Sequence, residues 1–159
     1  MNRFFASAGL AFALVASPAA AGVIGPTKPS QVVVLRVSGG GTNCQGGGGQ
    51  EADLQVRADG SIEPYMPPPG YGFVITGLDW GAAGNPADEY APVAIRLTNA
   101  SHPNSSSLVF VSGSVADGQG KSWGSALVPN VAVAPGTSVC VGVQGYTQAA
   151  VHGYFTPYK

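Results

Sequence analysis

Charged residues are scarce in this chain. Asp, Glu, Lys and Arg together make up 9% of the 159 residues, whereas about 25% is typical of a soluble domain. The formal net charge is −1 at pH 7, so the protein has no electrostatic attraction for the phosphates of nucleic acid or for an anionic membrane. We therefore expect no nucleic-acid partner.

Long hydrophobic runs are absent beyond the N-terminus, where residues 1–21 have the pattern of a secretory signal peptide. A basic start is followed by an uncharged apolar run over 4–16 and by small residues up to Ala21, which suits a signal peptidase. The apolar run is shorter than the roughly 20 residues that span a bilayer, and no cysteine follows the cleavage site to carry a lipid. The sequence predicts a single exported domain over 22–159, in the periplasm or the medium, with no transmembrane anchor.

Cysteine and histidine are nearly absent, which excludes several kinds of site. The two cysteines, Cys44 and Cys140, lack the Cys-x-x-Cys spacing of a redox centre, and no spacing of ligands supports a zinc site. We expect no metal and no cofactor. An even pair of cysteines in an exported chain predicts a disulfide, which would tie the glycine-rich segment 38–49 to a late strand.

Helical periodicity is missing beyond residue 21, and short runs rich in β-branched residues alternate with Gly and Pro turns. The expected strands are 31–37, 52–58, 61–63, 71–80, 92–98, 108–115, 121–128 and three further runs within 130–156. Such strands predict an all-β fold. An antiparallel, jelly-roll-like sandwich of two sheets is favoured over a barrel, because a bridge between an early loop and a late strand fits Greek-key closure.

Two turns and one irregularity are expected between these strands. Asp59-Gly60 is a two-residue hairpin signal, and residues 117–120 (Asp-Gly-Gln-Gly) are expected to join two strands as a hairpin. Gly77 lies inside the strand 71–80, where it is expected to mark a β-bulge.

Three segments carry a resemblance to a known group of proteins. They are 73–80 (Phe-Val-Ile-Thr-Gly-Leu-Asp-Trp), 135–141 (Pro-Gly-Thr-Ser-Val-Cys-Val) and 151–154 (Val-His-Gly-Tyr). Over the last two thirds of the mature chain, the sequence resembles small exported bacterial β-sandwich proteins. The resemblance implies a jelly-roll-like fold and bacterial export, and it carries no catalytic residues.

Motifs for nucleophilic or phosphate chemistry are missing. The serines lack the Gly-x-Ser-x-Gly setting of a hydrolase. Residues 120–122 form the Gly-Lys-Ser of a phosphate loop, but Val115 stands where the first glycine belongs, and a strand is expected where a helix should follow. His152 alternates with its neighbours in a strand, so we expect it to face solvent or to pair with an adjacent strand. No catalytic residue is predicted.

The acidic residues leave two alternatives open. Asp79, Asp88 and Glu89 would serve a glycan-active hydrolase or lyase if the fold brought two carboxyl groups into one cleft. Asp88 and Glu89, with backbone carbonyls, would suit a calcium ion, although no Asp/Asn ladder accompanies them. A solvated Asp88-Glu89 pair, with turn and surface residues at Asp79 and Asp117, accounts for the same residues.

Aromatic residues near strand ends give the leading functional hypothesis. A flat ring can stack on the apolar face of a sugar while polar neighbours bond its hydroxyl groups. Trp80, Tyr90 and Trp123 are therefore the candidate ligand-binding residues, although the same rings would suit the edge of a core. The sequence predicts a non-enzymatic binding module with a carbohydrate or an envelope protein as partner. The remaining alternative is a structural protein that assembles with itself through a sheet edge or face, and the sequence leaves the oligomeric state open.

Overall fold

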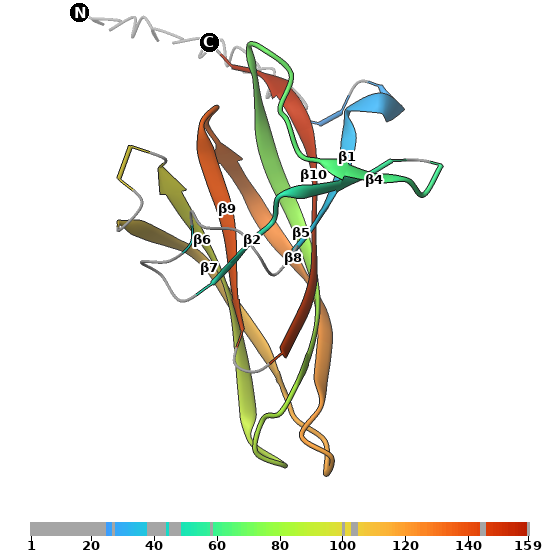
Figure 1. The fold of residues 1–159 in the computed structure, drawn as a ribbon, viewed down its shortest axis with the longest axis vertical. Coiled ribbons are helices and arrows are strands. Elements are labelled where there is room, and N and C mark those ends of the chain that lie inside the picture. The colour runs from blue at the N-terminus through green and yellow to red at the C-terminus, as the bar shows by residue number, and fades with distance from the viewer. Residues whose placement is uncertain are drawn as a thin grey trace, which may run out of the picture.

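Two antiparallel β-sheets pack face to face in the computed structural model of this protein (Figure 1). The structure describes residues 25–26, 28–37, 44, 49–57, 59–99, 101–102, 105–143 and 146–158. The predicted signal peptide and most of the glycine-rich segment 38–49 lie outside these residues. The described residues form one 3-10 turn, η1 (Pro29–Gln31), and ten strands. The two-sheet antiparallel sandwich that the sequence predicts is confirmed.

Six strands form one sheet and four form the other. The six-stranded sheet has the order β4 (Ile62–Pro64), β3 (Leu54–Val56), β1 (Val32–Arg36), β10 (Tyr146–Pro157), β5 (Tyr71–Ala83) and β8 (Ser122–Val133). The four-stranded sheet has the order β2 (Gln50–Glu51), β9 (Thr137–Val143), β6 (Tyr90–Asn99) and β7 (Ser106–Val115). The first and last strands, β1 and β10, are therefore neighbours. No helix among the described residues is long and apolar enough to cross a membrane.

Alternating side chains of both sheets build the core between them. Phe73, Ile75 and Leu78 of β5 are buried on one side, and Val93 and Ile95 of β6 are buried on the other. Phe73 and Ile75, like Val93 and Ile95, follow the period of two, whereas Leu78 comes after a shift in register and is three residues beyond Ile75. The residues between them face away from the core, so each sheet also presents an outer face.

Gly77 marks an irregularity in β5, as predicted. The register against β8 shifts there, since Ile75 pairs with Val131 but Gly77 pairs with Leu127. The prediction of separate strands over 121–128 and 130–134 is wrong, because β8 runs through Pro129 without a break. A proline is tolerated at this position because β8 is an edge strand, where a missing N–H interrupts no ladder of bonds.

The two expected hairpins have different outcomes. Asp59-Gly60 lies in the turn from β3 to β4, which pair with each other, so the hairpin is confirmed. Its loop is longer than the expected two residues, because the bond that closes it runs from Arg57 N–H to Ser61 O (2.9 Å). Residues 117–120 also turn the chain, but the strands on either side, β7 and β8, belong to different sheets, and the prediction of a paired hairpin is wrong. The backbone next to this turn bonds to the β5–β6 loop instead: Asp88 N–H donates to Ala116 O (3.1 Å), and Ala116 N–H donates to Glu89 O (2.9 Å). These bonds close the lower end of the sandwich in Figure 1.

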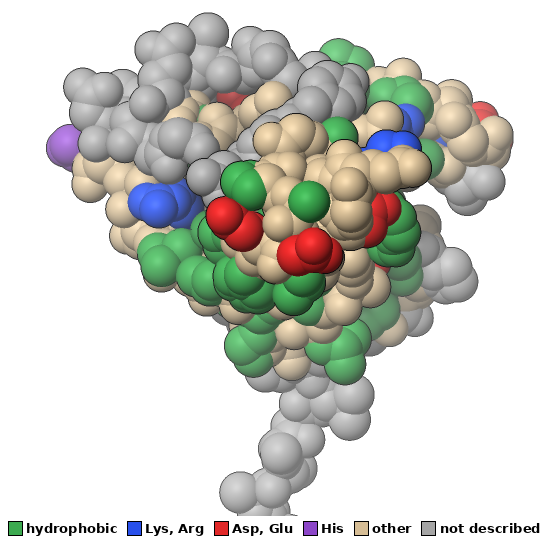
Figure 2. Space-filling model, turned by 90° about the horizontal axis from the view of Figure 1, so that it is seen from below, with side chains coloured by type: hydrophobic (Ala, Val, Ile, Leu, Met, Phe, Trp, Pro, Cys, Tyr) green, Lys and Arg blue, Asp and Glu red, His purple; other side chains and the backbone are tan. Residues whose placement is uncertain are grey.

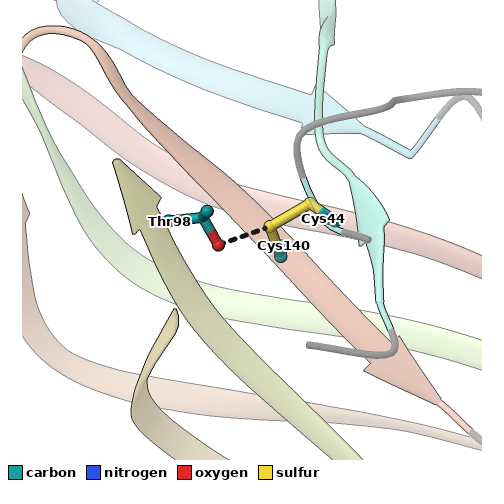
Figure 3. Close-up of a disulfide and its surroundings, with 3 residues drawn as sticks. All are labelled: Cys44, Thr98 and Cys140. Atoms are coloured by element: carbon teal, nitrogen blue, oxygen red, sulfur yellow. Dashed lines mark hydrogen bonds between the residues drawn. A yellow bond between two sulfur atoms is a disulfide. The ribbon is translucent and has the colours of Figure 1, made fainter. Parts of the chain in front are cut away.

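One disulfide joins Cys44 to Cys140 of β9, as predicted (Figure 3). Val139 and Val141 face the core, so Cys140 lies on the outer face of the four-stranded sheet, where both cysteines are nevertheless buried. The buried hydroxyl of Thr98 lies 3.4 Å from Cys140 Sγ, and it must donate because a disulfide sulfur carries no hydrogen. The bridge therefore fixes the chain before β2 onto the outside of the four-stranded sheet.

Candidate functional site

The outer face of the six-stranded sheet carries a group of polar side chains around Asp79. Asp79 lies on β5, opposite Ser125 of β8 and Ala150 of β10. Its neighbours Leu78 and Trp80 face the core, so alternation turns the carboxylate outward. About half of the Asp79 side chain (51%) is exposed, which leaves its oxygens accessible from solvent.

His152 of β10 pairs with this carboxylate. Its Nε2 lies 2.7 Å from Oδ2 of Asp79, although the strand register places His152 opposite Gly77. The imidazole lies close to Gly77, since a Cβ added there would be 3.7 Å from Cδ2 of the ring. This diagonal contact confirms the expectation that His152 pairs with an adjacent strand.

Ser125 completes the group, with Asp79 at its centre. Hydrogen bonds with Ser125 and then with His152 hold the pKa of Asp79 below its usual value. A serine hydrolase needs the histidine beside the serine, where it takes the hydroxyl proton. Here Ser125 and His152 each form a hydrogen bond with the carboxylate of Asp79, so the carboxylate, and not the histidine, stands at the centre. The group therefore presents a charged acceptor, the Asp79 carboxylate, with a hydroxyl and an imidazole on either side that can each donate or accept a hydrogen bond.

The lowered pKa of Asp79 predicts a pH-dependent contribution to stability. Because the carboxyl group ionises more readily in the folded chain, its ionised form stabilises the fold above the ordinary pKa of 3.8, and this contribution is lost as the pH falls through the folded value. Asp79→Asn should therefore melt below the wild type at neutral pH, by a small margin because the group is half exposed. Calorimetry should show the margin disappearing near pH 2; an equal margin at both pH values would contradict the assignment.

An exposed tryptophan lies beside this group on the same face. Trp123 of β8 is opposite Gly81 of β5, and Gly81 is opposite Gln148 of β10. Trp123 is 63% exposed, Gln148 is also exposed, and a Cβ added at Gly81 would meet nothing within 4 Å. The surface between the ring and the amide is therefore open. We call the following residues the outer platform: Trp123, Gln148, Asp79, Ser125 and His152.

The two other predicted aromatic residues lie elsewhere. Trp80 is only 6% exposed, and its ring packs in the core against Gly124 of β8. It therefore cannot meet a ligand at the surface, which corrects the interpretation made from the sequence. Tyr90 is 57% exposed, but it starts β6 in the other sheet, where its ring lies over Gly113 of β7. The structure does not bring the three residues together, and only Trp123 belongs to the outer platform.

The structure also does not bring together Asp79, Asp88 and Glu89, the acidic residues of the hydrolase alternative. Asp88 and Glu89 lie in the β5–β6 loop, whereas Asp79 lies on the sheet face four residues before the end of β5, roughly 13 Å along the strand. Figure 2 views the sandwich from this loop end and shows several acidic side chains near its middle, with hydrophobic and uncharged ones between them.

Asp117 has a structural role in its own turn. Its Oδ1 accepts hydrogen bonds from the backbone N–H groups of Gln119 (2.8 Å) and Lys121 (2.9 Å), which agrees with the expectation of a turn residue. Within the part of the chain that the structure describes, no group of three or more His, Cys, Asp or Glu side chains could hold a metal ion. The calcium alternative therefore gains no support from the described side chains.

A half-open cleft of about 230 Å³ lies between the β2–β3 junction and the turn before β9. Glu51 and Asp53 both line it, on either side of the buried Ala52, and Tyr65 lies beside them. Burial raises the pKa of Tyr65 to about 12. Two carboxylates in one cleft meet one requirement of the hydrolase alternative, with residues other than those predicted. No pattern in the sequence indicates these two carboxylates, because β2 has only two residues, too few to show a period.

No model of a known protein family matches the chain, and no curated protein matches it in sequence. The resemblance to small exported bacterial β-sandwich proteins stays a prediction. The functional argument therefore depends on the geometry of the outer platform.

Proposed function

We propose that this protein is an exported, non-enzymatic binding module whose outer platform holds a neutral polysaccharide chain. The observation that carries the proposal is the exposed ring of Trp123, which shares one open sheet face with the polar groups around Asp79. Export follows from the predicted signal peptide, and the disulfide suits the oxidising conditions of the periplasm or the medium.

Each part of the outer platform suits a sugar. The indole ring offers a flat apolar surface with little conformational freedom, and the carboxylate of Asp79 accepts hydrogen bonds from hydroxyl groups more strongly than a neutral oxygen would. The carboxamide of Gln148 both donates and accepts. An anionic polymer would be repelled by the carboxylate, so a neutral ligand is favoured.

The shape of the outer platform favours a chain over a single small molecule. Sites for small ligands are concave and bury most of the ligand, whereas Trp123, Gly81 and Gln148 form a row across the face of three adjacent strands. An envelope protein fits less well as partner, because the cores of protein interfaces are depleted in Asp, and Asp79 stands at the centre here.

Trp123→Ala is expected to weaken binding to neutral oligosaccharides on a glycan array by about tenfold or more, because the stacking surface is lost. Tyr158→Ala is the matched control, since Tyr158 is also an exposed aromatic residue (53%) and packs beside Gly72 near the opposite end of β5. Melting curves establish that both variants fold. If no neutral glycan binds the wild type, or if Trp123→Ala binds as the wild type does, the proposal is wrong.

A further inference from the structure

The two sides of the sandwich have very different edge strands. On one side the sheets end in β4 and β2, which have three and two residues. On the other side they end in β7 and β8, which have ten and twelve. A long edge strand presents a row of backbone groups to any further strand, so proteins usually shorten, charge or interrupt such edges.

Two of the four edges, β4 and β2, are protected in this way. β4 contains Pro64, and its Glu63 forms an ion pair of 2.6 Å with Arg57. β2 is too short to template a partner strand. β8 carries Pro129 in the stretch where its register against β5 shifts, but the strand continues through it. The last six residues of β7, 110–115, have neither a proline nor a charged residue nor a shift in register.

The backbone of β7 points its hydrogen-bonding groups toward this open side. Gly113 pairs with Pro92 of β6. A hydrogen-bonded antiparallel pair needs both residues to donate, and proline has no N–H, so this must be a non-hydrogen-bonded pair. The N–H and C=O of Gly113 therefore point away from β6, and by alternation so do those of Val111 and Val115.

The same segment reads identically in both directions. Residues 111–115 are Val-Ser-Gly-Ser-Val, so an antiparallel copy centred on Gly113 places Val111 opposite Val115 and Ser112 opposite Ser114. The two valines face outward and are exposed. Ser114 has a buried hydroxyl with no partner within the described part of the chain, and cross-strand pairs of hydroxyl residues stabilise sheets.

We propose that β7 pairs with β7 of a second copy of this chain about a two-fold axis at Gly113, which joins the two four-stranded sheets into one. A two-fold axis uses the same strand of both copies, so the contact gives a closed dimer and not a fibre. The paired segments are uncharged, so they do not repel each other. Three pairs that each exchange two bonds give about six backbone hydrogen bonds. Tyr90, whose ring lies over Gly113, lies at the junction. This inference does not depend on sugar binding, because the outer platform lies on the other sheet.

The test places charged residues at positions 111 and 115, which face each other between the two copies only in the proposed register. In V111K/V115K a lysine of one copy faces a lysine of the other, which should raise the dimer dissociation constant by about tenfold or more. In V111K/V115E each lysine faces a glutamate of the other copy, which should restore dimerisation relative to V111K/V115K. Within one chain the two positions lie roughly 13 Å apart, so neither effect arises inside a monomer. Sedimentation equilibrium over a concentration series of the purified protein measures both.

Ile62→Lys is the matched control, because Ile62 is an exposed apolar residue on the opposite edge strand, β4; it should leave the dissociation constant unchanged. Circular dichroism checks that every variant folds. A wild type that stays monomeric up to about 1 mM overturns the proposal. So does a dimer that V111K/V115K leaves intact, or one that V111K/V115E weakens as much as V111K/V115K does.

Discussion

Replacing both cysteines by serine is expected to lower the free energy of unfolding by about 4 kcal/mol. Cys44 and Cys140 are 96 residues apart, and a cross-link that closes a loop of this length removes a large share of the conformational entropy of the unfolded chain. The folded chain also loses the anchor that holds the segment before β2 on the four-stranded sheet. Urea unfolding followed by tryptophan fluorescence gives the difference.

Reduction supplies the control for this result. A reductant should destabilise the wild type by a similar amount and leave the double variant unchanged, because the variant has no bridge to break. Both cysteines are replaced together, since a single free thiol would form bridges between chains. A loss below about 1 kcal/mol would show that native strain or residual structure in the unfolded chain cancels the effect of the closed loop.

Gly153→Ala is expected to cost about 3 kcal/mol of stability. Gly153 of β10 lies opposite Ile75 of β5, next to the place where the register between the two strands shifts. A Cβ there would collide with the carbonyl oxygen of Val74 and would lie 2.5 Å from Cζ of Phe73. The Phe73 ring is itself held by an edge-to-face contact with Phe155, with 6.2 Å between ring centroids. Neither the backbone nor the buried ring has room to move, so the strand must shift.

Gly81→Ala separates this clash from the general effect of adding a methyl group to a strand. A Cβ at Gly81 would meet nothing within 4 Å, so this variant should be neutral or slightly more stable. Thermal unfolding of the two variants side by side gives the comparison. Equal stabilities would contradict the expected collision between a Cβ at position 153 and Phe73.

The burial of Trp80 shows how a local irregularity changes a prediction made from a period of two. Strict alternation from Phe73 and Ile75 would turn Asp79 inward and Trp80 outward. The shift at Gly77 reverses the phase, so Leu78 and Trp80 face the core. The sequence predicts a bulge at Gly77, and a bulge there is enough to place Trp80 inside.

The outer platform could not be predicted in the same way. Asp79 and His152 are 73 residues apart, and their contact depends on the register of β10 against β5, which no local pattern specifies. No local pattern specifies to which sheet β7 and β8 belong either. Residues 117–120 predict a turn from local chemistry, but whether the next strand pairs or crosses to the other sheet depends on distant partners. The strands can be predicted from composition and periodicity, and the disulfide can be predicted from the number of cysteines.

The pairing of β1 with β10 has a consequence for the synthesis of the protein. Val32 meets Tyr154, so the middle of the six-stranded sheet cannot form until nearly the whole chain has left the ribosome. Contacts between residues so far apart in sequence form slowly. A nascent chain that cannot close its main sheet stays extended, which is the state in which an unfolded precursor threads through a narrow translocation channel. If the chain is exported as proposed, this strand order would keep the main sheet open until the last strand has crossed.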